Sequence, residues 1–477
     1  MNEFYEKLLN PLQRYAEGEI SLEMIRNSLK VINQYFFNTH KDIGFTQKGD
    51  TTPYFSEFHK LWETKAEEIV APFLDEGKCI ALAEVFHQLK IKYGDKLFMT
   101  QRDLTGISLD EFALIRFLTA NQDFRGSRST KDIIVLYRQD PTLFDISTIA
   151  QNSATFLKKL GISQLSQNDK REKFIEQTIK FLQKHDVDPA GIPDVFDNDA
   201  LKIRQALIGN IGMGYGNKKT DMLIRDMYES QCWTNLINID GIDVASDINT
   251  IKVALRTGIL GTKLTPLLSS FLDIFCHQYG LMDEWNAKAW RLVWESWRDL
   301  HPDTVPYGPA YLDYFLYSVI GKTFCKDILY EYKGRNCGHN FFWPTGQVGR
   351  CVVCRDQFRN NTVTYVEEDG KLYAQCERFS EHKYITTSRR SKKCHICRNA
   401  ELPSVIKIGR FLPCMKDEGQ MCFGDLPITE CPFIKVCKPR EDSFKRLNPP
   451  KSISIYGQTG WESARADMNE GGGGLMA

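Results

Sequence analysis

The sequence predicts a mainly helical protein that ends in a cysteine-rich, metal-binding region. Three observations carry this prediction. Apolar residues recur at intervals of three and four up to about residue 325, ten of the 14 cysteines lie between Cys337 and Cys437, and 42% apolar against 26% charged residues is an ordinary globular composition. A chain of 477 residues is long enough for two or three domains, each with its own core.

Four consecutive regions are expected. Residues 1–100 and 101–325 are predicted to be two helical domains, 326–450 a cysteine-rich domain, and 451–477, which ends in GGGGLMA, a flexible tail. Helix starts are expected after Ser108 and Thr130, because each polar residue precedes an apolar helical pattern.

The tryptophans near residue 290 are expected to belong to the core. They fall at nearly helical spacing, and aromatic stripes of this kind usually pack inside a protein. The four residues are Trp285, Trp290, Trp294 and Trp297.

No membrane segment or secretion signal is expected. Charged residues interrupt the apolar ones throughout the first thirty positions, and the longest apolar stretch, 264–276, is shorter than the roughly 20 residues that span a bilayer. The sequence therefore predicts a cytoplasmic, nucleoid-associated monomer with no membrane partner. In such a chain, clustered cysteines indicate metal binding rather than disulfides. The four others, Cys79, Cys232, Cys276 and Cys325, are expected to be buried thiols.

The strongest local signal is a glycine-punctuated turn in IGMGYGNKKTDMLIRD, residues 211–226. Gly212, Gly214 and Gly216 allow positive φ and close backbone approach. A helix that begins near Lys218 would offer free N–H groups to a phosphate. A plain connection between packed helices uses the same residues, so the turn alone leaves both interpretations open.

Asp247 begins a second informative segment, DINTIKVALRTG. An aspartate at a helix N-terminus is ordinarily a cap for the exposed N–H groups. A carboxylate fixed in this way can also lie near the mouth of a cleft. A structural role and a catalytic role are therefore compatible.

Together these segments resemble the helix-hairpin-helix DNA glycosylases of the endonuclease III superfamily. GYGNKKT is similar to the family's G-V-G-x-K-T-A hairpin, and DINTIKVALRT to its D-T-H-[IV]-x-R-V-x-x-R-T segment. A third run, FLTANQDFR at 117–125, is similar to the family's L-S-x-Q-T-x-D run, in which a glutamine probes the DNA minor groove. The runs keep the family's order within 101–325, although ESQCWTNLINID lengthens the segment between hairpin and aspartate.

The resemblance implies a helix-hairpin-helix fold and an enzyme that flips a modified base out of double-stranded DNA and excises it. Asp247 would stabilise the positive charge that develops on the sugar. Lys218, with Lys219 beside it, would be the Schiff-base nucleophile of a bifunctional glycosylase and lyase; if it contacts only phosphate, water attacks instead. The DNA contacts implied are Gly212, Gly214, Gly216, Lys219, Asn121, Gln122, Asn249 and Lys252.

The sequence does not specify the excised base. The lengthened segment and the added domains favour a bulky modified base, such as a hypermodified cytosine of phage DNA, and hence a role in phage defence. Two other functions remain open. One is a non-catalytic DNA-binding protein with a hairpin and a zinc ribbon, and the other is an RNA-binding or RNA-modifying enzyme.

Two cysteine groups are predicted metal sites. The pairs CVVC and CHIC enclose β-prone sequence, as in a zinc ribbon with two thiolate knuckles. A second group closes with CPFIKVC, which resembles the end of the iron–sulfur loop of many of these glycosylases, although its earlier spacings depart from that loop. Zn2+ and a [4Fe–4S] cluster both fit this group, with the cluster slightly favoured. The eight ligands are Cys351, Cys354, Cys394, Cys397, Cys414, Cys422, Cys431 and Cys437, while Cys337, His339 and Cys376 are unassigned.

The cysteine-rich region is also basic. Residues 333–440 contain 19 Lys and Arg against 11 Asp and Glu, a net charge of +8 in a chain whose total is zero. Arg355, Arg359, Arg389, Arg390, Lys392 and Lys393 are therefore expected to contact the phosphate backbone. The runs TVTYV and KLYAQ, on either side of the turn Glu368–Gly370, are predicted to be strands.

Overall fold

The computed structural model describes residues 67, 71–100, 102–123, 129–162, 168–261 and 281–325, the strands between 329 and 411, and residues 427–428 and 430–437. This part of the chain is mainly helical, as the sequence predicts. None of its helices combines the length and the apolar character that a membrane crossing requires.

The chain divides into two compact units, each made of segments that are separated in the sequence. The helical unit comprises Cys79–Thr250 and Met282–Phe315. The mixed unit contains, among described residues, 67, 71–78, 251–261, 281 and those from Leu316 onward. The predicted domains 1–100, 101–325 and 326–450 are consecutive instead. Their limits stay predictions, because much of the first and last lies outside the described residues.

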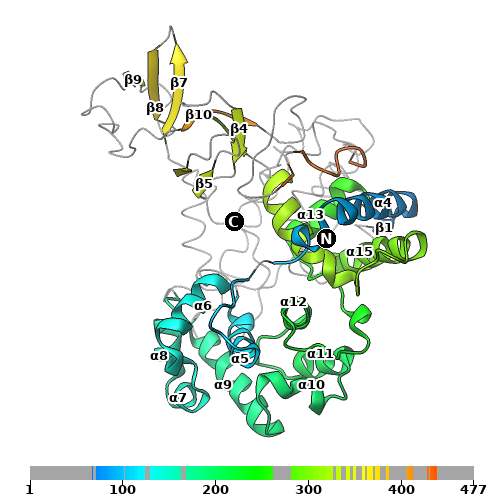
Figure 1. Ribbon diagram of the computed structural model, residues 1–477, viewed down its shortest axis with the longest axis vertical. Helices are drawn as coiled ribbons and strands as arrows, with labels where there is room; N and C mark the ends of the chain where they lie inside the picture. The colour runs from blue at the N-terminus through cyan, green and yellow to red at the C-terminus, as the bar shows by residue number, and fades with distance from the viewer. Residues whose placement is uncertain are drawn as a thin grey trace, which may run out of the picture. The chain divides into compact units, whose positions relative to one another are not determined.

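Helices of four to 20 residues build the helical unit (Figure 1). Helix α12 packs against α5 and α11, and α9 packs against α8. The helices are α4 (Glu76–Tyr93), α5 (Leu109–Thr119), α6 (Thr130–Gln139), α7 (Ile146–Gln151), α8 (Ser153–Lys159), α9 (Asn168–His185), α10 (Ile192–Val195), α11 (Ala200–Gly209), α12 (Asn217–Glu229) and α15 (Leu281–Leu300).

The caps of α5 and α6 show how local sequence sets helix starts. Ser108 caps α5 as predicted, and its side chain and that of Glu111 satisfy each other's backbone N–H groups in a capping box. The predicted cap Thr130 is wrong by one residue. Ser129 is the N-cap of α6, because its hydroxyl accepts from Asp132 N at 3.2 Å.

Aromatic and aliphatic side chains form the core of the helical unit. One cluster gathers Phe117, Tyr215, Leu223 and Trp233 from the segments around α12. Another joins α4 to α15 through the ring of Phe86, which stacks on Trp297 and meets Trp290 edge-on. Trp290, Trp294 and Trp297 are at most 5% exposed, which confirms the predicted core role for these three; Trp285 is half-buried.

Strands supply much of the described mixed unit. Strand β1 (Phe73–Leu74) pairs antiparallel with β2 (Leu260–Gly261), after helix α13 (Ile248–Thr257). A π-helical segment, η7 (Phe315–Phe324), leads into the strands. Three antiparallel sheets follow, in the orders β10-β3-β4, β5-β6 and β7-β8-β9.

The strand bounds confirm the two strands predicted on either side of residues 368–370. The antiparallel register of β7 and β8 ends with the pair Glu368 and Lys371. The strands are β3 (Leu329–Gly334), β4 (Asn340–Trp343), β5 (Val348–Arg350), β6 (Gln357–Arg359), β7 (Val363–Glu368), β8 (Lys371–Cys376), β9 (Lys383–Ile385) and β10 (Val405–Phe411).

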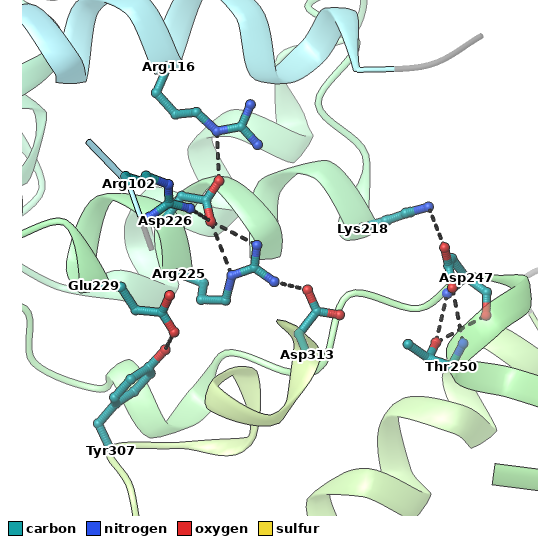
Figure 2. A network of polar contacts seen from close by, with 10 residues as sticks. All are labelled: Arg102, Arg116, Lys218, Arg225, Asp226, Glu229, Asp247, Thr250, Tyr307 and Asp313. Carbon is teal, nitrogen blue, oxygen red and sulfur yellow. Dashed lines mark hydrogen bonds and ion pairs between the residues drawn. The ribbon is translucent and has the colours of Figure 1, made fainter. Parts of the chain in front are cut away.

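A buried network of charges holds α12 in the helical unit (Figure 2). Asp226 accepts from Arg102 Nη2 at 2.6 Å, from Arg116 Nε at 2.7 Å and from Arg225 Nη2 at 2.7 Å. Arg225 also pairs with Asp313. Burial opposes ionisation of Asp226, but the three guanidinium groups hold the pKa of its carboxyl far below its usual range.

Glu229, one turn beyond Asp226, has fewer hydrogen-bond donors around its buried carboxyl than Asp226 has. Its Oε1 accepts from Tyr307 OH at 2.9 Å, and its buried Oε2 has no hydrogen-bond partner among the described residues. Burial raises the pKa of this carboxyl to about 7, although Arg225 acts in the opposite direction. Glu229 therefore changes its charge near neutral pH.

We expect Glu229→Gln to reduce the loss of stability that accompanies a rise in pH. The folded protein keeps the Glu229 proton up to a pKa of about 7, whereas an unfolded chain releases it near its ordinary value of 4.5. The contribution of Glu229 to the free energy of unfolding is therefore fully present below pH 4.5. It is lost as the pH rises through about 7, and the total loss is on the order of 3 kcal/mol. Urea unfolding at pH 5 and pH 8 measures the difference between variant and wild type. Equal pH dependence in both proteins would contradict this role.

Candidate active site

The glycine turn between α11 and α12 has the backbone geometry that its sequence predicts at two of three positions. Gly212 and Gly214 have φ of +102° and +75°, a region that favours glycine. Gly216 is instead the N-cap of α12, with φ of −90° and no neighbouring atom within 4 Å of where a Cβ would stand. As a glycine, this N-cap offers no side-chain hydrogen bond to the first N–H groups of α12.

Gly214 allows Phe174 of α9 to pack closely against the glycine turn. A Cβ at this position would lie 2.5 Å from Cδ2 of Phe174, closer than carbon atoms can approach. The aromatic ring therefore occupies the room that a side chain would need.

We expect Gly214→Ala to destabilise the protein by about 2 to 5 kcal/mol. The estimate combines about 1–2 kcal/mol for a left-handed alanine with about 1–3 kcal/mol for overpacking against Phe174. Gly216→Ala is the matched control, since its backbone is extended and its surroundings are open. Urea unfolding compares the two variants. A loss no greater for Gly214→Ala than for Gly216→Ala would show that the turn is not constrained in this way.

The two lysines at the start of α12 have different surroundings. The Lys218 side chain is 42% exposed, and its Nζ lies 3.4 Å from Asp247 Oδ2. Lys219 Nζ donates to the carbonyl of Asn121 at 2.5 Å and lies 5.7 Å from the centre of the Phe174 ring. Burial lowers the pKa of the Lys219 ammonium to about 7, an effect that the sequence did not indicate.

Asp247 is both the cap of α13 and the partner of Lys218. Its Oδ1 accepts from the backbone N–H groups of Asn249 at 2.8 Å and Thr250 at 3.0 Å. The Thr250 hydroxyl in turn accepts from Asp247 N at 3.0 Å. These bonds fix the carboxylate through one oxygen and leave Oδ2 facing Lys218.

The contact between Lys218 and Asp247 joins α12 to the start of α13 (Figure 2). Only 6% of the Asp247 side chain is exposed, so this carboxylate is shielded from bulk water. The half-exposed ammonium and the buried carboxylate thus lie within the helical unit, 29 residues apart in the sequence. A lysine amine thus lies beside a carboxylate whose negative charge can stabilise a cation.

Asn121 and Gln122, the residues expected to probe DNA, are buried. They are 0% and 2% exposed. Asn121 Nδ2 donates to Thr178 Oγ1 and to the carbonyl of Met213, both at 2.9 Å, and Gln122 Nε2 donates to Asn121 Oδ1 at 3.0 Å. In this structure, the two amides contact the glycine turn and α9 rather than face solvent.

Asn249 and Lys252 also make contacts within the protein. Asn249 Nδ2 lies 3.4 Å from Asp247 Oδ2, so this side chain helps to orient the carboxylate. Lys252 is 7% exposed, and its Nζ donates to the carbonyl of Gly321 at 3.4 Å. Their expected contacts with DNA remain predictions.

The lengthened segment ESQCWTNLINID packs into the helical unit. Trp233 is 1% exposed, and its Nε1 donates to the carbonyl of Pro189 at 3.0 Å. Leu236 and Ile239 belong to the same core cluster. Much of the apolar surface in this segment therefore stabilises the fold around α12.

Of the predicted metal ligands, only Cys431 and Cys437 lie in the described part of the chain. Both are buried. They begin and end the segment CPFIKVC, in which Cys437 N donates to Phe433 O at 2.8 Å. The described residues contain no group of three or more metal-binding side chains. Cys376 ends β8. The other predicted ligands and unassigned residues lie outside the described residues: Cys351, Cys354, Cys394, Cys397, Cys414, Cys422, Cys337 and His339.

Three buried or half-buried polar residues near Asp247 were not predicted from the sequence. Ser246, Asp283 and Asn286 form a connected set of hydrogen bonds around it. Asp283 and Asn286 lie on α15, and only their spacing within one helical turn is visible in the sequence.

No family model, curated protein or solved structure matches this chain.

Proposed function

We propose that this protein is a DNA glycosylase of the helix-hairpin-helix type, which excises a modified base with Asp247 at its active site. The single observation that supports this most strongly is the contact between Lys218 Nζ and Asp247 Oδ2. It unites the two segments on which the resemblance to the endonuclease III superfamily depends.

Asp247 is suited to stabilise a cationic transition state. Cleavage of the N-glycosidic bond develops oxocarbenium character on the sugar, and a shielded carboxylate stabilises that charge. The two backbone N–H groups on Oδ1 hold the carboxylate in place, so little reorganisation accompanies the reaction. The target nucleotide must leave the base stack to reach this site.

The glycine turn is suited to bind the DNA backbone next to this carboxylate. The open space at Gly216 and the uncapped N-terminus of α12 leave N–H groups available to a phosphate. The exposed part of Lys218 adds a positive charge beside them. Sequence-independent backbone contacts of this kind would position the strand, while the flipped base is recognised elsewhere.

The test of this proposal is the release of free base from duplex DNA that carries single modified bases. The panel includes hypermodified cytosines of phage DNA, the proposed substrates, together with 8-oxoguanine and alkylated purines. Better activity on the latter two would contradict the phage-base assignment. A protein that binds every DNA but releases no base would be the non-catalytic DNA-binding protein, and preference for RNA competitors would favour an RNA-directed function.

Lyase activity is tested by borohydride trapping. If Lys218 attacks the sugar, reduction of the imine links protein to DNA, and Lys218→Ala abolishes that link. Lys219→Ala is the matched control, because burial lowers the pKa of this neighbouring amine to about 7 while its Nζ donates to the Asn121 carbonyl. A link that persists in Lys218→Ala and disappears in Lys219→Ala would transfer the nucleophile to Lys219; no link with normal base release would identify a monofunctional enzyme.

The cysteine groups are proposed to bind metal. Cys431 and Cys437 are both buried and lie six residues apart, and together with Cys414 and Cys422 they would supply the four thiolates of such a site. Zn2+ or a [4Fe–4S] cluster there would stabilise the mixed unit rather than take part in chemistry at Asp247. Metal analysis and the visible absorption spectrum distinguish zinc from iron.

A further inference from the structure

A row of four lysines and one glutamine runs along α9. These residues recur at intervals of three and four, so they share one face of the helix. The four lysines are exposed, whereas Ile175, Ile179 and Leu182 on the opposite face are buried. We call this row the lysine stripe, and its members are Lys170, Lys173, Gln177, Lys180 and Lys184.

The glycine turn lies beside the lysine stripe. A Cβ at Gly212 would stand 3.4 Å from Gln177 Cγ and 3.8 Å from Lys173 Cε. Ile211, directly before this glycine, is 92% exposed, more than any other large apolar side chain of the described residues. A DNA strand held at the turn would therefore lie within reach of both the stripe and this isoleucine.

The positive charge of the lysine stripe is not neutralised by ion pairs. Exposed lysines on other helices pair with acids, as Lys159 does with Asp140 at 3.3 Å and Lys202 with Asp197 at 2.6 Å. Within the part of the chain described, no acid lies at ion-pair distance from the stripe lysines. The acids of α9 occupy the neighbouring face, also at intervals of three and four: Asp169, Glu172 and Glu176.

The charge of the lysine stripe extends to the start of α12. Burial is the largest cause of the lowered pKa of the Lys219 ammonium, and the Asp123 carboxylate opposes it. Lys170 of α9 and Lys218 of α12 both lower this pKa further. Their charges thus act on the same point, which makes the positive potential continuous from the stripe to the glycine turn.

We propose that the lysine stripe binds the phosphate backbone of the DNA strand at the glycine turn, and that Ile211 packs against a sugar of this strand. This inference rests on the proposed function, because it extends the DNA contact of the turn along a second helix. The helix rises about 21 Å from Lys170 to Lys184. One strand carries a charge about every 3.4 Å along the duplex axis, so the stripe spans about six phosphates.

The side chains of this surface suit a DNA backbone of any sequence. A lysine ammonium is a point charge on a flexible stem, which attracts a phosphate without reading a base. Ile211 adds a contact of another physical kind, because burial of its side chain against a sugar releases no counterions. The two contacts can therefore be separated by their dependence on salt.

The salt dependence of DNA binding tests the role of the stripe. Each lysine that neutralises a phosphate contributes about 0.9 to the slope of log affinity against log salt concentration. A triple variant with Lys173→Gln, Lys180→Gln and Lys184→Gln should therefore reduce that slope by about 2.7 on duplexes of any sequence. Lys170 is retained, because its charge also acts on Lys219. Fluorescence anisotropy between about 50 and 200 mM salt measures the slope.

The matched control removes three lysines that already have acidic partners. Lys159, Lys202 and Lys288 are 51%, 53% and 51% exposed. Their replacement by glutamine changes the net charge by the same amount but should change the slope by less than about 1. An equal fall in both triple variants would show that net charge, rather than the stripe, determines affinity. Circular dichroism should show the same helix content in both.

Ile211→Ala should weaken DNA binding about tenfold at every salt concentration, because it removes an apolar contact and no charge. Ile237→Ala is the control, since this side chain is 56% exposed and lies outside the glycine turn. Wild-type affinity in Ile211→Ala would overturn the sugar contact.

The outcomes separate this inference from the proposed function. A wild-type slope in the stripe variant, with normal base release, would overturn the inference alone. Stripe-dependent binding to DNA without release of any base would support the inference and contradict the glycosylase assignment. Stripe-dependent binding to RNA and not to DNA would overturn the assignment of the partner.

Discussion

Asp247→Asn should slow base release by about 10²- to 10³-fold, the usual effect of removing one preorganised electrostatic group from an active site. The asparagine side chain keeps the size of aspartate and can still accept from Asn249 N and Thr250 N, so the cap of α13 is retained. What it loses is the negative charge opposite Lys218. Single-turnover kinetics with saturating enzyme measure this chemical step directly.

Asp243→Asn is the matched control for this variant. Asp243 lies four residues earlier, pairs with Arg291 at 2.7 Å and is about as exposed as that partner. DNA affinity should be the same in both variants, because the glycine turn is untouched. If Asp247→Asn retained the wild-type rate, the carboxylate would be a structural cap and no more.

Asp226→Asn should destabilise the protein by about 3–5 kcal/mol, the largest effect on stability that we expect. Removal of one member of a buried ion network leaves uncompensated charge, which costs about that much. Here the charge left behind would be shared by Arg102, Arg116 and Arg225, all at most 10% exposed. Asp313 and the weakly ionised Glu229 could offset only part of it.

An exposed ion pair provides the comparison for Asp226. Asp299 is 70% exposed and lies 3.3 Å from Arg298, so Asp299→Asn should change the free energy of unfolding by less than about 1 kcal/mol. Urea unfolding of both variants measures the contrast. A loss for Asp226→Asn as small as for Asp299→Asn would show that the network contributes little.

Features within a single helical segment could be predicted from the sequence, because local spacing determines them. The capping box at Ser108, the positive φ at Gly212 and Gly214 and the cap formed by Asp247 belong to this group. The core position of Trp290 followed in the same way from helical periodicity.

Features that depend on contacts between distant segments could not be predicted. Asp283 approaches Asp247 from a helix that begins 34 residues later in the chain, and nothing in its local sequence distinguishes it from an ordinary first-turn acid. Asn121 was expected at a DNA interface, but the carbonyl of Met213, which binds it, is 92 residues away. The same limit applies to Asp226, whose partners Arg102 and Arg116 are more than 100 residues away in sequence.

The most direct test of the central claim is mass spectrometry of the small molecules released when the wild-type protein acts on the panel of modified DNAs. A DNA glycosylase releases one free base for each abasic site or strand break that it makes, and Asp247→Asn should release far less. If the wild-type protein binds these DNAs and no free base appears from any of them, the pair formed by Lys218 and Asp247 is not a glycosylase active site.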